Sequence, residues 1–318
     1  MVACRLDVPG ILLLLCMSST AQDLKVTLLG TGSPQPRIER FGPSTLVEAG
    51  GQKLLIDCGR GSSQRIWQMH ISLSAVTAIF LTHLHSDHIV GVPDLWLTGW
   101  LPPVYGHRTQ PFRIWGPAGT KRMMAKLKEA YQADIEFRLN DEKNPPDGIA
   151  VVAEDISQGV VYERDGLKVT AFDVDHRPIE PAFGYRIDYA GHSVVLSGDT
   201  RVSENLIRFS KGTDLLIHEV AMARQEVLDK SAPARAIMAH HTSPEEAGTV
   251  FSQVKPKLAV FNHFVFVTTD PKISEPTVTD VLSSARKNYD GPMEIGEDLM
   301  TIEIGNKIVV HRSAPSAR

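Results

Sequence analysis

The most constraining feature of the sequence is a run of metal-ligand side chains that directly follows an apolar strand. The predicted strand Val76–Leu81 leads into His83-Leu84-His85-Ser86-Asp87-His88. Buried imidazole and carboxylate groups need hydrogen-bond partners or a metal ion, because an unpaired polar group is costly in a protein core. Imidazole nitrogen and carboxylate oxygen are ligands that suit zinc. The run therefore predicts that His83 and His85 share one ion, and that Asp87 and His88 turn toward a second.

The alternative interpretation is a polar loop with incidental histidines. Four ligand-type residues so close together disfavour it, as does the arrival of others at the ends of downstream strands.

The rest of the chain alternates short apolar runs with helical stretches from Leu24 onward, without an internal repeat or a polar linker. The other expected strands are Leu24–Leu29, Thr45–Glu48, Lys53–Ile56, Val160–Glu163, Lys168–Asp173, Phe183–Asp188, Ser193–Leu196, Asp214–Ile217 and Leu258–Phe261. The expected helices are Ser62–Met69, Thr120–Ala133, Ser203–Phe209, Pro244–Val254 and Ser274–Lys287, and Asn140–Gly148 is expected to be a loop. This pattern predicts one α/β domain over residues 22–318, a sandwich of two mixed β-sheets with helices outside.

The four residues His83, His85, Asp87 and His88 match the HxHxDH signature of the metallo-β-lactamase superfamily, which the chain resembles over nearly its whole length. Further segments resemble the ribonuclease Z and arylsulfatase-like branch: Leu29-Gly30-Thr31-Gly32-Ser33, Leu55-Ile56-Asp57-Cys58-Gly59, Ser197-Gly198-Asp199-Thr200, Ile217-His218-Glu219 and His241-Thr242-Ser243. The resemblance implies the αββα metallo-β-lactamase sandwich and a hydrolase with two zinc ions per chain.

The resemblance also supplies the remaining ligands. It implies one zinc ion held by His83, His85 and His176, and a second held by Asp87, His88 and His263, with Asp199 spanning both. His176, Asp199 and His263 each come directly after a predicted strand, which supports them independently.

Three further residues are candidates for roles beside the metals. Asp57 ends the strand Lys53–Ile56, and the resemblance implies that it accepts a hydrogen bond from a ligand histidine. A turn aspartate is the alternative. The resemblance pairs Glu219 with His241, which would contact the anionic oxygens and protonate the leaving oxygen. The alternative for His241 is a neighbour of the next helix cap.

The expected chemistry is hydrolysis in which a metal-bound hydroxide attacks the substrate and no covalent enzyme intermediate forms. Asp87, beside its role as a ligand, is a candidate acceptor for the proton of the attacking water. The sequence does not say which bond is cut. The leading hypothesis is hydrolysis of a small anionic ester, either a phosphodiester or a sulfate. The alternative is hydrolysis of β-lactams, and the third hypothesis is a metal-binding protein without enzymatic activity.

Transfer RNA is disfavoured as a substrate on three grounds. Only 23 positions separate His176 from Asp199, which leaves no room for a long basic arm of the kind that grips tRNA in many ribonuclease Z proteins. The formal net charge of -4 agrees with that absence. The third ground is an N-terminal export signal.

Residues 1–21 read as a signal peptide, with Arg5, an apolar run over Ile11–Met17 and small residues at Ser19-Thr20-Ala21. We expect a periplasmic or secreted protein that begins at Gln22 and is free of the membrane. A membrane-anchoring N-terminus is the alternative. Removal of the signal takes away Cys4 and Cys16, so Cys58 is left as an inert core thiol without a disulfide partner.

Two segments near the expected site stay open. Arg37 and Arg40, in the loop after the first strand, either bind an anionic substrate or do nothing specific. The stretch Trp96–Arg113 has three possible roles: an apolar wall near the metals, ordinary packing at a helix end, or a dimer contact. A homodimer is possible.

Overall fold

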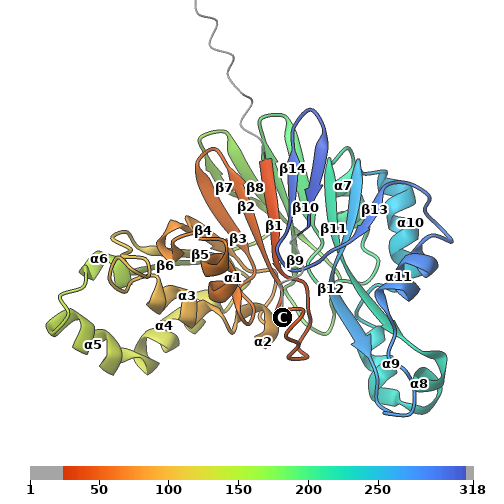
Figure 1. Ribbon diagram of the computed structural model, residues 1–318, viewed down its shortest axis with the longest axis horizontal. Helices are drawn as coiled ribbons and strands as arrows, with labels where there is room; N and C mark the ends of the chain where they lie inside the picture. The colour runs from red at the N-terminus through yellow and green to blue at the C-terminus, as the bar shows by residue number, and fades with distance from the viewer. Residues whose placement is uncertain (1–23, 313–318) are drawn as a thin grey trace, which may run out of the picture.

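The computed structural model describes residues 24–312, and within them the strands form two sheets (Figure 1). The first sheet has eight strands in the spatial order β15 (Ile308–His311), β14 (Met300–Ile304), β1 (Leu24–Gly30), β2 (Ser44–Ala49), β3 (Gln52–Ile56), β4 (Ala78–Phe80), β5 (Phe112–Gly116) and β6 (Val151–Asp155). The second has seven in the order β13 (Met293–Ile295), β12 (Leu258–Val267), β11 (Leu215–Ala223), β10 (His192–Leu196), β9 (Phe183–Tyr189), β8 (Leu167–Asp173) and β7 (Gly159–Arg164).

Both sheets are mixed. In the first, β2 pairs antiparallel with β3, whereas β3, β4, β5 and β6 run parallel. In the second, each strand from β7 to β10 pairs antiparallel with the next, whereas β10, β11, β12 and β13 run parallel. The predicted sandwich of two mixed sheets is therefore confirmed.

Alternating residues of the central strands enter two different cores. On β3, Leu54 and Ile56 are buried between the two sheets, while Leu55 is buried against helices on the outer face. Because both faces are covered, these strands read as nearly continuous apolar runs. Among the described residues, one apolar core lies between the sheets, one on each outer face, and a smaller fourth beside β11 and β12.

Helices cover both outer faces, as predicted. The first sheet carries α1 (Ser62–Gln68), the 3-10 turn η1 (Leu73–Ala75), α3 (Val92–Thr98), α4 (Thr120–Ala130), α5 (Gln132–Asn140) and α6 (Pro146–Ile149). The second carries α7 (Glu204–Ser210), α10 (Pro244–Val254) and α11 (Val278–Ala285). The short α2 (Ser86–Ile89) lies at the lower edge in Figure 1, and α8 (Gln225–Lys230) and α9 (Ala232–Met238) form a separate lobe at the lower right.

Several boundaries differ from the sequence-based expectation. The helix expected over Thr120–Ala133 ends at Ala130, because Tyr131 leaves helical geometry, and a new helix, α5, then reaches Asn140. The expected loop Asn140–Gly148 therefore shrinks, and its end belongs to α6. Strands β5, β6 and β13 to β15 were missed. The last of these, β15, has no buried residue within the described chain, so its sequence carries little apolar signal.

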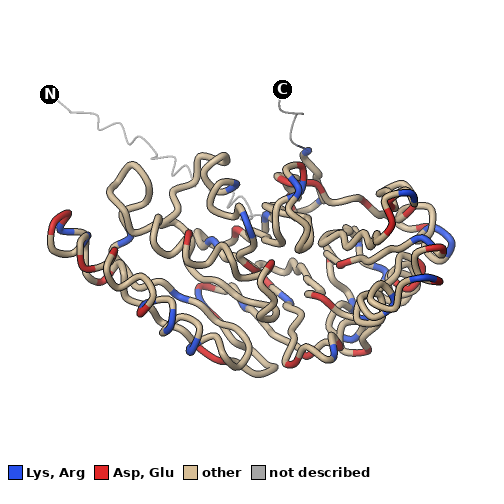
Figure 2. Tube along the Cα trace, turned by 90° about the horizontal axis from the view of Figure 1, so that it is seen from below, with Lys and Arg blue, Asp and Glu red and all other residues tan. Residues whose placement is uncertain are grey.

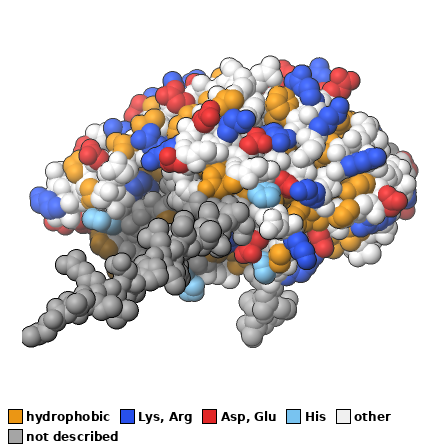
Figure 3. Space-filling view, turned by 90° about the horizontal axis from the view of Figure 1, so that it is seen from above, with side chains coloured by type: hydrophobic (Ala, Val, Ile, Leu, Met, Phe, Trp, Pro, Cys, Tyr) orange, Lys and Arg blue, Asp and Glu red, His pale blue; other side chains and the backbone are white. Residues whose placement is uncertain are grey.

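The surface is mixed in charge. Seen from the side where α2 lies, Lys and Arg are interspersed with Asp and Glu (Figure 2). The opposite face likewise mixes both signs with apolar side chains where it is visible (Figure 3). Within residues 24–312 there is no helix long and apolar enough to cross a membrane. The predicted signal peptide, with Cys4 and Cys16, lies outside the described residues. Cys58 is buried, and burial raises the pKa of its thiol to about 12, as an unreactive thiol requires.

Candidate metal centre

The seven predicted ligand side chains lie together at the edge of the sandwich where several strands end. They fall into two groups, His83, His85, His176 and Asp199 in one and Asp87, His88 and His263 in the other, and His241 forms a third possible group with Asp199 and His263. Within each group the candidate ligand atoms lie within 4.8 Å of one another. The local run supplies four of them, His83 and His85 from the segment between β4 and α2 and Asp87 and His88 from α2 itself. The others come from after β8, after β10 and from within β12.

Asp199 lies between the two groups. Its Oδ2 atom is 3.5 Å from Nε2 of His88 and 3.6 Å from Nε2 of His263. The same atom is 3.8 Å from Nε2 of His83 and 3.9 Å from Nε2 of His176. Burial raises the pKa of the Asp199 carboxyl, but the imidazoles of His263, His88 and His83 outweigh it and hold the pKa well below its ordinary value. A carboxylate in this position can contact a cation in either group.

The hydrogen bonds of the histidines suit metal binding. His176 Nδ1 donates to the carbonyl oxygen of His240 at 2.9 Å, so the neutral ring has its lone pair on Nε2. That Nε2 is buried and has no hydrogen-bond partner, and the same is true of Nε2 of His83. Buried acceptors without partners are costly unless a cation or water occupies the space between them. The residues therefore fit a divalent metal of the imidazole-and-carboxylate type.

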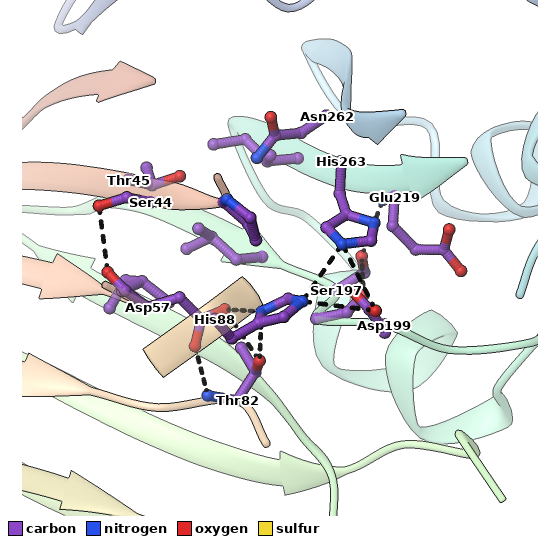
Figure 4. Close-up of a pocket in the computed structure, with 15 residues that line it drawn as sticks. Ser44, Thr45, Asp57, Thr82, His88, Ser197, Asp199, Glu219, Asn262 and His263 are labelled. Atoms are coloured by element: carbon purple, nitrogen blue, oxygen red, sulfur yellow. Dashed lines mark hydrogen bonds and ion pairs between the residues drawn. The ribbon is translucent and has the colours of Figure 1, made fainter. Parts of the chain in front are cut away.

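Asp57 holds His88 from behind the cluster (Figure 4). Its Oδ2 accepts from His88 Nδ1 at 2.8 Å and from Thr82 Oγ1 at 2.9 Å, and its Oδ1 accepts from the Thr82 amide at 2.8 Å. Asp57 itself adopts φ +58°, a conformation few non-glycine residues take. Burial lowers the pKa of the His88 imidazole, but Asp199, Asp57 and Asp87 outweigh it and raise the pKa well above its ordinary value, so a proton and a metal ion compete for its Nε2. Thr82 was not singled out in the sequence, where only its position before His83 hinted at a role.

Glycines allow α2, which carries Asp87 and His88, to approach the loop after β3. A side chain at Gly59 would place its Cβ 2.5 Å from the Asp87 carbonyl oxygen, and one at Gly91 would place it 2.3 Å from the Gly59 carbonyl oxygen. The amide of Cys58 donates to the His88 carbonyl, which pins this turn to the sheet. The close backbone contact explains why these positions need glycine.

His263 reaches the site through a β-bulge. In the pairing of β11 with β12, Glu219 faces Asn262 and Val220 faces Phe264, so His263 is the extra residue, at φ +45°. A bulge re-aims one side chain. The expectation that Glu219 and His263 follow their strands was wrong, because both lie inside longer strands. The strands continue because Ala221, Val265 and Val267 pack against the lobe of α8 and α9.

Glu219 and His241 lie beside the metal-ligand cluster as an ion pair, with Oε1 and Nδ1 3.2 Å apart. Glu219 Oε1 also accepts from the amides of Thr200 at 3.2 Å and Thr242 at 3.0 Å. Burial lowers the pKa of His241, but the Glu219 carboxylate outweighs it, so the pKa is raised to about 9. This pairing favours the protonated imidazole, and the ring borders a region that Asp199 and His263 also border.

Packing contacts account for several residues whose roles the sequence left open. Arg40 donates to Thr31 Oγ1 and to the Gly296 carbonyl, with its guanidinium over the Phe264 ring, so it fixes the loop after β1. Arg37 pairs with Glu275. In the stretch Trp96–Arg113, Trp96 and Trp100 are fully buried and donate to the carbonyls of Ile149 and Pro145. These two tryptophans are therefore helix-end packing, whereas Val104 and Tyr105 of the same stretch are exposed.

Comparison with known proteins identifies the family of this chain. Residues 52–264 match the family model described as "Beta-lactamase superfamily domain". The chain is 35% identical over 286 residues to "Ribonuclease Z" of Mycolicibacterium gilvum, a match that covers 88% of this chain and 96% of that protein. It is likewise 35% identical over 286 residues to "Ribonuclease Z" of Mycobacterium bovis, covering 88% and 98%.

Solved structures share the fold. The metallo-β-lactamase fold protein YhfI from Bacillus subtilis superposes with a TM-score of 0.68 at 18% identity, covering 88% of this chain and 99% of that one. Human tRNase Z, short form, superposes with a TM-score of 0.65 at 23% identity, covering 87% and 98%. The chain therefore belongs to the metallo-β-lactamase superfamily and, within it, to the ribonuclease Z family of metal-dependent hydrolases.

Proposed function

We propose that this chain is an exported phosphodiester hydrolase that binds two zinc ions. The observation that carries the proposal is the cluster of seven ligand-type side chains around Asp199, with the imidazole of His241 beside it. The first ion would be held by His83, His85 and His176, and the second by Asp87, His88 and His263, with Asp199 between them. Two ions bound there supply an activated water and neutralise the anionic oxygens of a substrate.

The side chains around the metals have distinct tasks in this proposal. His241 donates a proton to the leaving oxygen, and Glu219 keeps that imidazole protonated and in place. Asp87 is a candidate acceptor for the proton of the attacking water. Burial raises the pKa of Asp87, but His88 and His263 outweigh it and keep the carboxylate ionised, as an acceptor must be.

The class of phosphodiester is the next question. A small anionic ester is favoured by the net charge of -4 and by the interspersed charges on the site side of the molecule (Figure 2). RNA is the second candidate, because the relatives at 35% identity are named Ribonuclease Z. The missing arm between His176 and Asp199 no longer counts against RNA, because the match to the Mycolicibacterium protein covers 96% of it and leaves no long segment unmatched.

A panel assay on zinc-loaded protein tests the proposal. The substrates are bis-p-nitrophenyl phosphate, p-nitrophenyl sulfate, a chromogenic β-lactam and a tRNA with a 3′ extension. We expect turnover of the phosphodiester. Turnover of the β-lactam or the sulfate alone would overturn the phosphodiester assignment, and cleavage of the tRNA at rates far above the small diester would make RNA the substrate. No turnover of any of them by protein that binds zinc would favour a non-enzymatic metal-binding role.

Export is the part of the proposal that rests on sequence alone. If residues 1–21 are a signal peptide, the mature protein begins at Gln22. N-terminal sequencing of the protein from the periplasmic or secreted fraction measures this directly. An intact N-terminus in the cytosol would contradict export and would strengthen the RNA candidate.

A further inference from the structure

Three consecutive residues between α9 and α10 each contact a different part of the candidate metal centre. The carbonyl oxygen of His240 accepts from Nδ1 of His176 at 2.9 Å. The imidazole of His241 pairs with Glu219. The hydroxyl of Thr242 donates to the carbonyl oxygen of Thr200, next to Asp199, at 2.6 Å. One short segment therefore joins a candidate ligand, the candidate proton donor and the loop of the shared carboxylate.

Thr242 is the member of this segment whose side chain links two loops directly. It is fully buried, and its amide donates to Glu219 Oε1 while its carbonyl accepts from Ala221. The same Glu219 Oε1 accepts from the Thr200 amide. Glu219, Thr200 and Thr242 are thus each hydrogen-bonded to the other two. Two of these three hydrogen bonds end on the Glu219 carboxylate, and the third joins the Thr242 hydroxyl directly to the Thr200 carbonyl.

Capping of the following helix does not explain the Thr242 hydroxyl. The N-cap of α10 is Ser243, whose hydroxyl accepts from the Glu246 amide in a complete capping box. The hydroxyl of Thr242 points instead to the loop after β10. Removing the hydroxyl would leave the carbonyl of the fully buried Thr200 without this hydrogen-bond donor. The loop that contains Thr200 would then be free to move.

We propose that Thr242 is a positioning residue that fixes the Asp199 loop against His241. The proposal rests on the function proposed above. Asp199 is adjacent to Thr200, and His241 is adjacent to Thr242, so the hydroxyl link sets the separation between the shared metal ligand and the proton donor. Loosening it weakens metal binding through Asp199 and misplaces His241 relative to the leaving oxygen.

The experiment compares Thr242→Val, which removes the hydroxyl at nearly constant volume, with Thr242→Ser, which keeps it. Thr242→Ala is measured alongside, because it removes the same hydroxyl without adding a buried methyl group. The matched control is Thr213→Val. Thr213 is also buried, and its hydroxyl donates to the carbonyls of Ser193 and Leu215 at the far end of β11. Zinc affinity is measured by competition with a chromophoric chelator, and kcat and KM on bis-p-nitrophenyl phosphate.

In Thr242→Val and Thr242→Ala we expect zinc affinity to fall about 10- to 100-fold, the usual effect of losing a group that orients a metal ligand. We also expect kcat to fall by a similar factor with KM changed little, whereas Thr242→Ser matches the wild type. Folded Thr242→Val and Thr242→Ala proteins with wild-type zinc affinity would overturn the proposal, as would equal losses in Thr213→Val. Because chelator competition needs no turnover, it decides the role of Thr242 even if the wild type cleaves no phosphodiester.

Discussion

Replacing His241 with alanine separates proton donation from metal binding. The imidazole lies against Glu219, outside the two groups of side chains assigned to the zinc ions. The variant should therefore keep both ions. Its loss of stability should be modest, because Glu219 Oε1 still accepts from the amides of Thr200 and Thr242.

The size of the catalytic effect follows from the state of the imidazole. The Glu219 carboxylate raises the pKa of His241 to about 9, which favours the protonated imidazole that a general acid needs at pH 7. A general acid contributes roughly 10²- to 10⁴-fold to a rate, which corresponds to about 2.7 to 5.5 kcal/mol of barrier. His241→Ala should lower kcat by that factor for poor, high-pKa leaving groups and by much less for a nitrophenyl ester.

The assay measures kcat for a series of phosphodiesters with leaving groups of increasing pKa, alongside zinc content by elemental analysis. Glu219→Gln is the companion variant. Its amide oxygen can still accept from Thr200 and Thr242, but it lacks the charge that holds the His241 proton, so the same trend should appear more weakly. A zinc-replete His241→Ala protein that turns over poor and activated leaving groups equally, both near the wild-type rate, would remove His241 from the mechanism.

Three further predictions concern the metals and the fold. Elemental analysis should find about two zinc ions per chain, since seven ligand residues are too many for one tetrahedral ion. The Asp199→Ala variant should lose at least one of them. A content of one zinc ion per chain that does not increase when zinc is added would contradict this. Asp57→Ala should weaken zinc binding about 10- to 100-fold in chelator competition, because His88 loses the acceptor that orients it; unchanged affinity would make Asp57 a turn residue only. Asp214 accepts from the Ser193 amide and pairs with Lys257, and although burial raises its pKa, Lys257 and the amide lower it overall. Its stabilising effect is therefore present above about pH 4 and lost as pH falls through the folded-state pKa. Asp214→Asn should lower the free energy of unfolding by about 1–2 kcal/mol near neutral pH, measured by denaturant unfolding, and the difference from wild type should shrink in acid. A difference independent of pH would refute the ionic contribution.

The local part of the site was readable from the sequence because its residues are neighbours in the chain. His83, His85, Asp87 and His88 sit within six positions, directly after an apolar strand, so one turn of backbone brings them together. His176 and Asp199 were readable for a related reason. Each follows a strand, and strand ends that share one edge of a sandwich place their loops side by side.

The sequence alone also predicted strands β1 to β4 and β7 to β12 in their order along the chain, but it missed β5 and β6 in the middle of the chain. It did not determine the outer elements, such as β15 or the break between α4 and α5 at Tyr131, because exposed strands and helix ends carry weak apolar signals.

Only the tertiary structure decided how the distant residues meet. The bulge that turns His263 toward Asp199 depends on the pairing of β11 with β12, and the sequence of neither strand alone indicates it. The roles of Thr82 and Thr242 likewise depend on hydrogen bonds to Asp57 and Thr200, which are 25 and 42 positions away in the chain. A threonine has the same local signature whether its hydroxyl faces water or a buried carbonyl. Its partner is set by packing between elements, and packing is a property of the folded chain.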